Sequence, residues 1–141
     1  MPLLLIPHIH RTTHQIGLYI GRSGLGVSQG EAHILAHLAE VGDCSIADLH
    51  KAFAHKRSTL TSVLDRLSDR NLIRREVSAK DRRSFTVRLT PTGKKLARRV
   101  YRLLVELERA ALNRIEGAVE CRTVLEAIDR VCVGSRRAGT D

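Results

Sequence analysis

Aromatic residues are scarce in this chain, which has two Tyr, two Phe and no Trp among its 141 residues. Hydrophobic residues nevertheless make up 43% of it, so a core must be built from Leu, Ile, Val and Ala. Such a composition favours helix over sheet. The length suits one domain with a real hydrophobic core and is too short for us to expect two.

Cysteines and long apolar runs are also few. Cys44, Cys121 and Cys132 form neither an even set nor a CxxC pair, so we expect no disulfide framework and no zinc knuckle. The apolar opening segment is interrupted by Pro7 and His8 and lacks the basic start of a signal peptide. No run approaches the length of a transmembrane helix. These absences predict a cytoplasmic protein that does not contact a membrane.

Motifs of catalysis and metal binding are missing as well. The chain has no GxSxG motif and no phosphate loop, and the glycine-spaced segment 21–26 does not follow a predicted strand. His33 and His37 have the i, i+4 spacing that can place two imidazoles on one metal. However, no Glu follows His33 in an HExxH arrangement, and no third ligand is evident nearby. We therefore expect neither an enzyme nor a bound metal or cofactor.

Positive charge, in contrast, is plentiful and concentrated. Residues 51–102 hold sixteen Lys and Arg against four Asp and Glu, whereas the rest of the chain holds eight against eleven. A localised basic segment suits a polyanion, because neutralising phosphates releases condensed counterions. A basic surface that serves only solubility is the alternative.

Apolar spacing and capping residues predict six helices. Ser28 and Glu31 form a capping-box pair, and Ser45 with Asp48 indicates another helix start. Thr90 followed by Pro suits the start of a long helix. The tail, 135–141, is expected to fray. The predicted helices span about 8–22, 28–42, 46–54, 57–70, 91–115 and 119–133.

Two strands are predicted between the fourth and fifth helices, over 73–77 and 85–89. In the second strand, apolar and polar residues alternate with the period of a sheet that buries one face. Asn71 suits the left-handed conformation that ends a helix. The result is a mainly α (α+β) fold: a winged helix-turn-helix with about six helices, long terminal helices and a β-hairpin wing. Such motifs place one helix in the major groove of DNA.

The helix over 57–70 has the features of a recognition helix. Its apolar residues recur on one stripe, while the opposite face carries short polar side chains. Ser58, Thr61 and Ser62 suit contacts with base edges. Arg57 and Arg66 can reach either guanine or a phosphate, and the sequence does not decide between them. Near the helix start, Lys56 and Thr59 suit phosphate contacts; ordinary exposed surface is the alternative for each.

The connection between the two strands is strongly cationic. Lys80, Arg82 and Arg83 fall at the expected hairpin tip, where cations suit a narrow, electronegative minor groove. A solvated turn is the alternative.

Three short runs resemble the signature of the MarR family of bacterial transcription regulators. They are Leu72-Ile73-Arg74, Asp81-Arg82-Arg83 and Leu89-Thr90-Pro91-Thr92-Gly93. The resemblance implies one MarR-like domain over 1–141. About 1–27 and 94–141 would be dimerisation helices, and about 28–93 the winged helix-turn-helix lobe.

The resemblance also implies a homodimer that binds a pseudopalindromic operator in double-stranded DNA. Arg83 would enter the minor groove, and Asp81 would orient the wing arginines by ion pairing. Two positions depart from the family pattern. Asn71 stands where the family usually has Gly, and His50 stands where a small residue often packs within the helix-turn-helix.

We therefore expect a sequence-specific dimeric repressor that a small-molecule effector releases from DNA. By resemblance, the effector lies between the terminal helices and the winged lobe, where Tyr19, His33, His37 and Tyr101 are candidate lining residues. A metal- or redox-responsive regulator and a non-specific nucleic-acid-binding protein remain as alternatives. Cys44, close to a helix start, is a candidate redox group.

Overall fold

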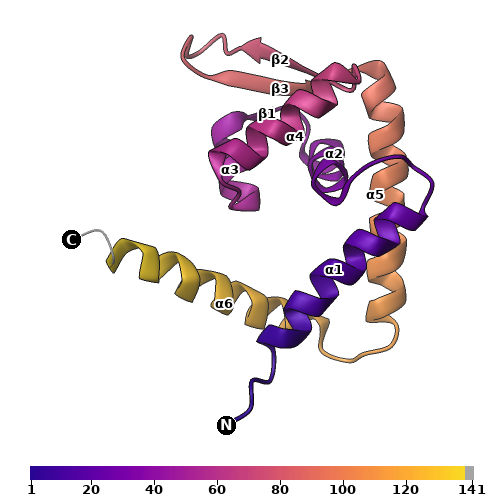
Figure 1. The fold of residues 1–141 in the computed structure, drawn as a ribbon, viewed down its shortest axis with the longest axis vertical. Coiled ribbons are helices and arrows are strands. Elements are labelled where there is room, and N and C mark those ends of the chain that lie inside the picture. The colour runs from indigo at the N-terminus through magenta and orange to yellow at the C-terminus, as the bar shows by residue number, and fades with distance from the viewer. Residues whose placement is uncertain (139–141) are drawn as a thin grey trace. The chain divides into compact units, whose positions relative to one another are not determined.

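The structure is a computed structural model that describes residues 1–138. Figure 1 shows that most elements of the chain are helices and that the strands form one small sheet. In that part of the chain no helix is long and apolar enough to span a membrane. The elements are α1 (Ile6–Arg22), α2 (Gln29–Val41), β1 (Cys44–Ser45), α3 (Ile46–Phe53), α4 (Arg57–Asp69), β2 (Ile73–Val77), β3 (Phe85–Leu89), α5 (Pro91–Leu112) and α6 (Ala118–Ala138).

The six predicted helices and both predicted strands are present, with small shifts at their ends. Helix α1 begins at Ile6 instead of residue 8, and α5 ends at Leu112 instead of 115. The expectation of a frayed tail is wrong for 135–138, since α6 continues to Ala138. Residues 139–141 of that tail lie outside the described part of the chain. The chain divides into two compact units, one through Leu104 and one from Val105 onward.

Side-chain caps start α2, α3 and α5 where the sequence predicts, and the cap of α5 by Thr90 is described below. The Ser28 hydroxyl accepts a hydrogen bond from the Glu31 N–H at 3.2 Å, and the Glu31 carboxylate accepts one from the Ser28 N–H at 3.2 Å. The Ser45 hydroxyl accepts from the Asp48 N–H at 3.0 Å. Such caps satisfy N–H groups that have no partner within the first turn of a helix.

The sheet has three antiparallel strands in the order β1-β3-β2. Strands β2 and β3 form the predicted hairpin, with Ile73 opposite Leu89 and Val77 opposite Phe85. Strand β1 was not predicted. It is only two residues long, and Cys44 is identified as a strand residue by its pairing with Val87. A segment this short carries no periodicity that a sequence could reveal.

The core lies within the winged helix-turn-helix and the first half of α5. The apolar stripe of α4 is buried as predicted, and α4 packs against α2 and β2. Removing one buried Leu side chain from such a core costs about 2–5 kcal/mol. The most completely buried large side chains are Ile20, Ile34, Leu35, Leu49, Leu60, Leu64, Leu67, Val87 and Val100.

The end of α4 and the start of α5 meet closely at one glycine. Asn71 has a φ of 56°, the left-handed conformation expected of it. The buried Thr90 hydroxyl donates to the Asn71 carbonyl oxygen at 2.7 Å and accepts from the Gly93 N–H at 2.9 Å. A Cβ added to Gly93 would overlap the Leu72 carbonyl oxygen. Only glycine therefore allows the first turn of α5 to approach Leu72 this closely.

We expect Gly93→Ala to lower the free energy of unfolding by at least about 1–3 kcal/mol, because a methyl group would be forced into occupied space. Urea unfolding followed by circular dichroism measures the change. Gly21→Ala is the matched control: it lies in α1 with nothing within 4 Å of an added Cβ, so helix propensity should leave stability equal or higher. Equal destabilisation by both substitutions would contradict the close approach at Leu72.

Candidate nucleic-acid interface

Helix α4 exposes the polar face that the sequence assigns to it. Lys56, the N-cap residue, makes no side-chain cap hydrogen bond, and the first turn holds no acidic residue. The N–H groups at this end, and the positive end of the helix dipole, are therefore open to a phosphate. Arg66 donates to the Ser62 hydroxyl at 3.0 Å, so these two side chains lie together. The exposed residues are Lys56, Arg57, Ser58, Thr59, Thr61, Ser62 and Arg66.

The wing tip is shaped by hydrogen bonds of its own backbone and short side chains. The Asp81 carboxylate accepts from the Arg83 backbone N–H at 3.0 Å, and the Asp81 carbonyl oxygen accepts from the Ser84 N–H at 3.1 Å. The expected ion pairs between Asp81 and the wing arginines are wrong for the described residues. Asp81 instead sets the turn, because its side chain is short enough to reach the backbone two residues later.

The wing cations are left exposed by this arrangement. Lys80, Arg82 and Arg83 are all exposed, and none joins an ion pair within residues 1–138. Their charges are therefore available to a polyanion.

Two arginines, Arg75 and Arg88, brace the wing through ion pairs that sequence reasoning missed. Arg75 of β2 binds the Asp65 carboxylate of α4 at 2.8 Å. Arg88 of β3 binds Asp43 at 3.0 Å and lies 3.7 Å from Glu76. Exposed pairs of this kind contribute little to stability, about 0–1 kcal/mol each. The Arg75–Asp65 pair does, however, tie the wing directly to the proposed recognition helix.

The turn between α3 and α4 is closed by His50. After α3 ends at Phe53, Ala54 takes a left-handed conformation with a φ of 52°. The His50 Nδ1 then lies 3.3 Å from the His55 carbonyl oxygen. Because a carbonyl only accepts, His50 must carry a proton on Nδ1. The residue that departs from the family pattern thus connects the two helices of the motif.

The four predicted effector residues lie on three different helices, α1, α2 and α5. Tyr19 is exposed on α1, and Tyr101 packs against the core from α5. His33 and His37 lie on α2, where the His37 ring contacts Phe53 of α3 with 5.2 Å between ring centroids.

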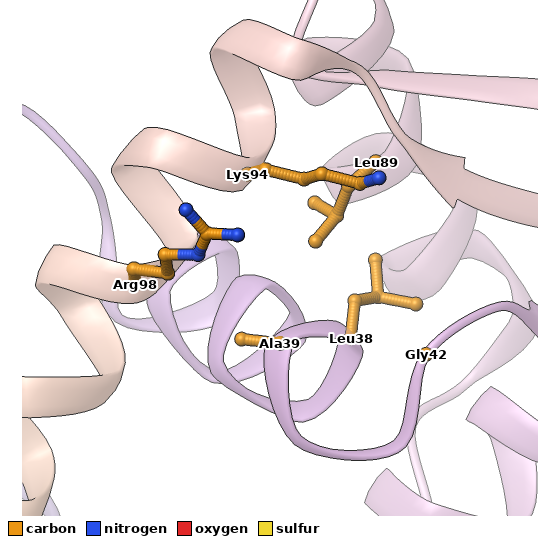
Figure 2. A pocket seen from close by; sticks show the side chains of 6 residues that line it. All are labelled: Leu38, Ala39, Gly42, Leu89, Lys94 and Arg98. Atoms are coloured by element: carbon orange, nitrogen blue, oxygen red, sulfur yellow. The ribbon is translucent and has the colours of Figure 1, made fainter.

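A cavity of about 220 Å³ lies elsewhere, between α2 and α5. Figure 2 shows Lys94 and Arg98 of α5 reaching over Leu38 of α2. Lys94 and Arg98 are one helical turn apart, so one face of α5 supplies both cations. The lining residues are Leu38, Ala39, Gly42, Leu89, Lys94 and Arg98.

The metal and redox alternatives gain no support. Within residues 1–138, no three His, Cys, Asp or Glu residues are grouped so that they could hold a metal ion. Cys44 is buried. Burial raises the pKa of the Cys44 thiol, and the nearby carboxylates of Asp48 and Asp43 raise it further. A thiol held in its protonated form is a poor nucleophile and a poor redox sensor.

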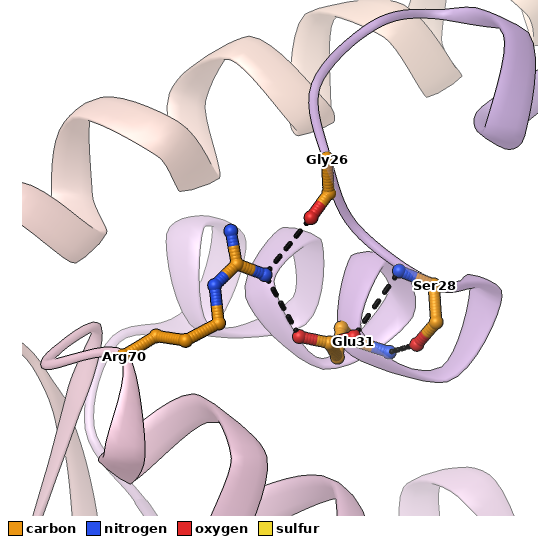
Figure 3. Close-up of polar contacts among 4 residues, drawn as sticks. All are labelled: Gly26, Ser28, Glu31 and Arg70. Atoms are coloured by element: carbon orange, nitrogen blue, oxygen red, sulfur yellow. Dashed lines mark hydrogen bonds and ion pairs between the residues drawn. The ribbon is translucent and has the colours of Figure 1, made fainter.

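Glu31 connects the start of α2 to the end of α4. Its carboxylate accepts from the Ser28 N–H on one oxygen and from the Arg70 guanidinium at 3.0 Å on the other. Figure 3 shows the same Arg70 nitrogen also donating to the Gly26 carbonyl oxygen, at 2.9 Å. Glu31 is only 6% exposed. Arg70 caps the C-terminus of α4, so this network anchors the exit of the proposed recognition helix.

The pKa of Glu31 reflects two opposing effects. Burial raises it, whereas the hydrogen bonds from Ser28 and Arg70 and the positive charge of Arg70 lower it. The hydrogen bonds and the charge of Arg70 together outweigh the effect of burial, so the pKa of Glu31 lies below its usual value. The carboxylate is therefore charged at neutral pH, and its ion pair with Arg70 is formed.

Comparisons with known proteins show which proteins this chain is similar to. A family model for the MarR family matches residues 23–84. The chain is 32% identical to the HTH-type transcriptional regulator PecS of Dickeya dadantii over 142 residues, which cover 96% of this chain and 86% of that one. It is 34% identical to the HTH-type transcriptional repressor MdtR of Bacillus subtilis over 68 residues, which cover 48% and 44% of the two chains.

Solved structures share the fold. The structure of S. aureus MepR in its DNA-binding conformation superposes with a TM-score of 0.76 at 20% identity, and the match covers 94% of this chain and 98% of that one.

We expect Glu31→Gln to lower the free energy of unfolding at neutral pH by about 1–3 kcal/mol, the range for losing a charge-assisted hydrogen bond. The folded pKa of Glu31 is lowered, so its stabilisation is complete above the unfolded value of 4.5 and is lost as pH falls through the folded pKa. The difference between wild type and variant in urea unfolding should therefore shrink below that pH.

Glu126→Gln serves as the control for this prediction. Glu126 pairs with Arg122 on the exposed surface of α6, at 2.8 Å. The Glu126→Gln variant should therefore unfold like the wild type at every pH. A gap between wild type and Glu31→Gln that stayed constant down to acid pH would contradict the ion pair with Arg70.

Proposed function

Because the chain belongs to the MarR family of transcription regulators, we propose that it is a repressor that binds a pseudopalindromic operator as a homodimer in the cytoplasm. Members of this family are DNA-binding regulators and not enzymes. The observation that carries the proposal is the pairing of two exposed surfaces, the polar face of α4 and the cationic wing tip. The Arg75–Asp65 ion pair holds α4 and the wing together.

Helix α4 is proposed to enter the major groove. Ser58, Thr61 and Ser62 lack apolar bulk and are exposed, which suits hydrogen bonds with base edges. Arg57 and Arg66 suit guanine or phosphate, and the open helix start with Lys56 and Thr59 suits phosphate. Lys80, Arg82 and Arg83 are proposed to lie along the minor groove. Asp81 acts indirectly, through the shape of the turn.

Exposed apolar side chains support the homodimer. Several large hydrophobic residues lie exposed at the two ends of the chain, and covering them in a dimer would remove their apolar surface from water. We propose that about 1–27 and 94–141 form the dimer interface, and that about 28–93 form the DNA-binding lobe. The exposed apolar residues of α1, the segment before it, and α6 include Leu3, Leu4, Leu5, Ile6, Leu18, Val119, Val124, Leu125, Val131 and Val133.

The cavity between α2 and α5 is the proposed effector site. Lys94 and Arg98 supply two positive charges beside the apolar Leu38 and Leu89, an arrangement that suits a small anion with an apolar body. Its volume of about 220 Å³ fits only a small molecule. An effector there would release DNA only if it favours one conformation of the lobe over another.

Selection of bound sequences from a random pool of duplex DNA tests the central proposal. We expect a pseudopalindromic consensus, because a two-fold dimer presents two copies of α4 to two half-sites. On the selected operator, Arg83→Ala should weaken binding by about 1–3 kcal/mol, the scale of a good groove contact.

Arg74→Ala is the matched control, since Arg74 is exposed on β2 and is neither one of the proposed DNA contacts nor part of the proposed dimer interface. It removes the same charge and should change affinity much less. Equal losses for the two variants would refute the assignment of the wing, and a pool without a consensus would favour the non-specific alternative.

Operator affinity should also depend steeply on salt. If Lys56 and one wing cation of each subunit neutralise phosphates, the four contacts per dimer give a slope of about −3.6 in log affinity against log salt concentration. A titration at several salt concentrations measures this slope. A nearly flat dependence would contradict a role for the basic segment in phosphate binding.

A further inference from the structure

Helix α6 carries two cysteines and several apolar residues that its own chain leaves exposed. None of the residues 118–135 is buried, although Leu125, Val131, Cys121 and Cys132 are all apolar. Cysteine, leucine and valine are among the residue types that folded proteins bury most often. The proposed DNA contacts and the proposed effector cavity use none of these side chains. We therefore asked what could cover them.

The two exposed cysteines cannot bond to each other within one chain. Eleven positions separate Cys121 from Cys132 on one continuous helix. They therefore lie on nearly the same face, but about 16 Å apart along the helix axis. A disulfide requires Cα atoms within about 7 Å of each other. The third cysteine, Cys44, is buried in the other compact unit. A disulfide between the two exposed positions would thus have to join two chains.

The residues in line with these cysteines form a stripe that matches itself when the helix is reversed. Their spacing of three and four residues is that of the contact positions between two packed helices. In order, the stripe reads small, cysteine, large aliphatic, large aliphatic, cysteine, small. The first and last residues, the two cysteines and the two aliphatic residues all share one midpoint. The α6 stripe consists of Ala118, Cys121, Leu125, Ile128, Cys132 and Ser135.

A two-fold axis through this midpoint would pair two copies of α6 antiparallel. In such an interface, a residue and its mate exchange places between the subunits. Cys121 would lie opposite the partner's Cys132, and Leu125 opposite the partner's Ile128. Packed helices lie about 8–10 Å apart and each Cα lies about 2.3 Å from its own axis, so facing cysteines come within the reach of a disulfide.

The residues beside the α6 stripe match under the same axis. Arg122 and Asp129 flank it on one side, and Val124 and Val131 flank it on the other. In an antiparallel pair, Arg122 lies beside the partner's Asp129, and Val124 beside the partner's Val131. A parallel pair would instead place Val124 beside the partner's Asp129. Charge and apolar character therefore both favour the antiparallel pair.

We propose that α6 pairs antiparallel with α6 of a second copy of this chain, and that a peroxide closes two disulfides across the pair, each joining Cys121 to the partner's Cys132. The inference rests on the proposed homodimer, because it specifies how α6 contributes to that interface. The disulfides prevent the two subunits from separating on dilution. This role differs from redox sensing at Cys44, which lies in the winged helix-turn-helix and stays buried.

A peroxide balances the reaction. The thiolate of one cysteine attacks a peroxide oxygen, the O–O bond breaks, and a sulfenic acid forms as water or an alcohol leaves. The thiolate of the facing cysteine then attacks the sulfenic sulfur, so the S–S bond forms and the hydroxide leaves as water after taking up a proton. Each disulfide consumes two thiols and one peroxide. A reducing cytoplasm keeps the thiols free, so the cross-link forms only while a peroxide is present.

The test begins with the wild-type protein treated with hydrogen peroxide. Remaining thiols are blocked by alkylation, and the products are separated by gel electrophoresis without reductant. We expect a covalent dimer that dithiothreitol returns to single chains. Peptide mapping by mass spectrometry should find Cys121 joined to Cys132. Cross-links between two copies of the same cysteine would overturn the proposal.

Two single variants distinguish the antiparallel pair from any other contact. Cys121→Ser and Cys132→Ser change exposed positions and each leave one exposed thiol per chain. In the antiparallel pair these remaining thiols lie about 16 Å apart, so each variant alone should lose the covalent dimer. Co-expressed in equal amounts, the two variants should recover it in about half of the chains, because half of random two-fold pairs place the intact cysteines opposite each other.

A covalent dimer in either single variant would refute the proposal, since a parallel pair or random collision would then explain the cross-link. Failure of the mixture to recover the dimer would refute it as well. If a variant does not fold, which circular dichroism shows, the peptide map of the wild type decides.

Sedimentation of the reduced protein and the selection of operator DNA separate this proposal from the proposed function. A reduced homodimer with a selected operator but no cross-link would disprove the α6 pair alone. Recovery of the cross-link in the mixture without a selected operator would leave the α6 pair standing and disprove operator binding.

Discussion

The carboxylate of Glu31 joins three segments that lie far apart in the sequence. One oxygen completes the capping box with Ser28 at the start of α2, and the other binds Arg70 at the end of α4. Arg70 also holds the carbonyl oxygen of Gly26, in the loop before α2. Because the carboxylate is almost fully buried, losing Arg70 would leave its charge without compensation. The position of the proposed recognition helix depends on this network at one end.

The other end of α4 is held differently. There the helix has no side-chain cap, and the preceding turn is connected to α3 through the hydrogen bonds from His50 to the His55 carbonyl oxygen and from the Ala54 N–H to the His50 carbonyl oxygen. A hydrogen bond of 3.3 Å with an imidazole is a weaker constraint than a buried ion pair. The same helix is therefore held by a buried ion pair where it leaves the motif and by weaker hydrogen bonds where it enters. The open N-terminus is also the end that suits a DNA phosphate.

The arginines of the basic segment fall into two groups with different roles. Arg70, Arg75 and Arg88 bind carboxylates and hold α4 and the wing in place. The cations of the wing tip and of the exposed face of α4 have no such partners in the part of the chain that the structure describes. Charge counting along the sequence cannot separate these groups, because both contribute equally to the net charge. Only the first group orients the surface that the second presents.

The local features of this protein could be predicted from its sequence. The stripe of Leu60, Leu64 and Leu67, the caps of Ser28 and Ser45, and the left-handed Asn71 all arise from contacts within about four residues. The order of helices and strands predicted the winged helix-turn-helix, and the three family runs predicted membership of the MarR family, which the comparisons confirm. Strand β1, the Arg75–Asp65 brace and the cavity beside Lys94 and Arg98 could not be predicted.

These features depend on residues brought together by the tertiary structure. Asp65 and Arg75 lie on different elements, and Arg70 meets Glu31 across 39 positions. The contact between the Phe53 ring of α3 and the His37 ring of α2 has the same origin. The sequence by itself determined the helices, the hairpin and the basic segment, because periodicity and capping act locally. The tertiary structure alone decided which charges are paired and which stay exposed, because distance in space, and not spacing along the chain, governs a Coulomb interaction.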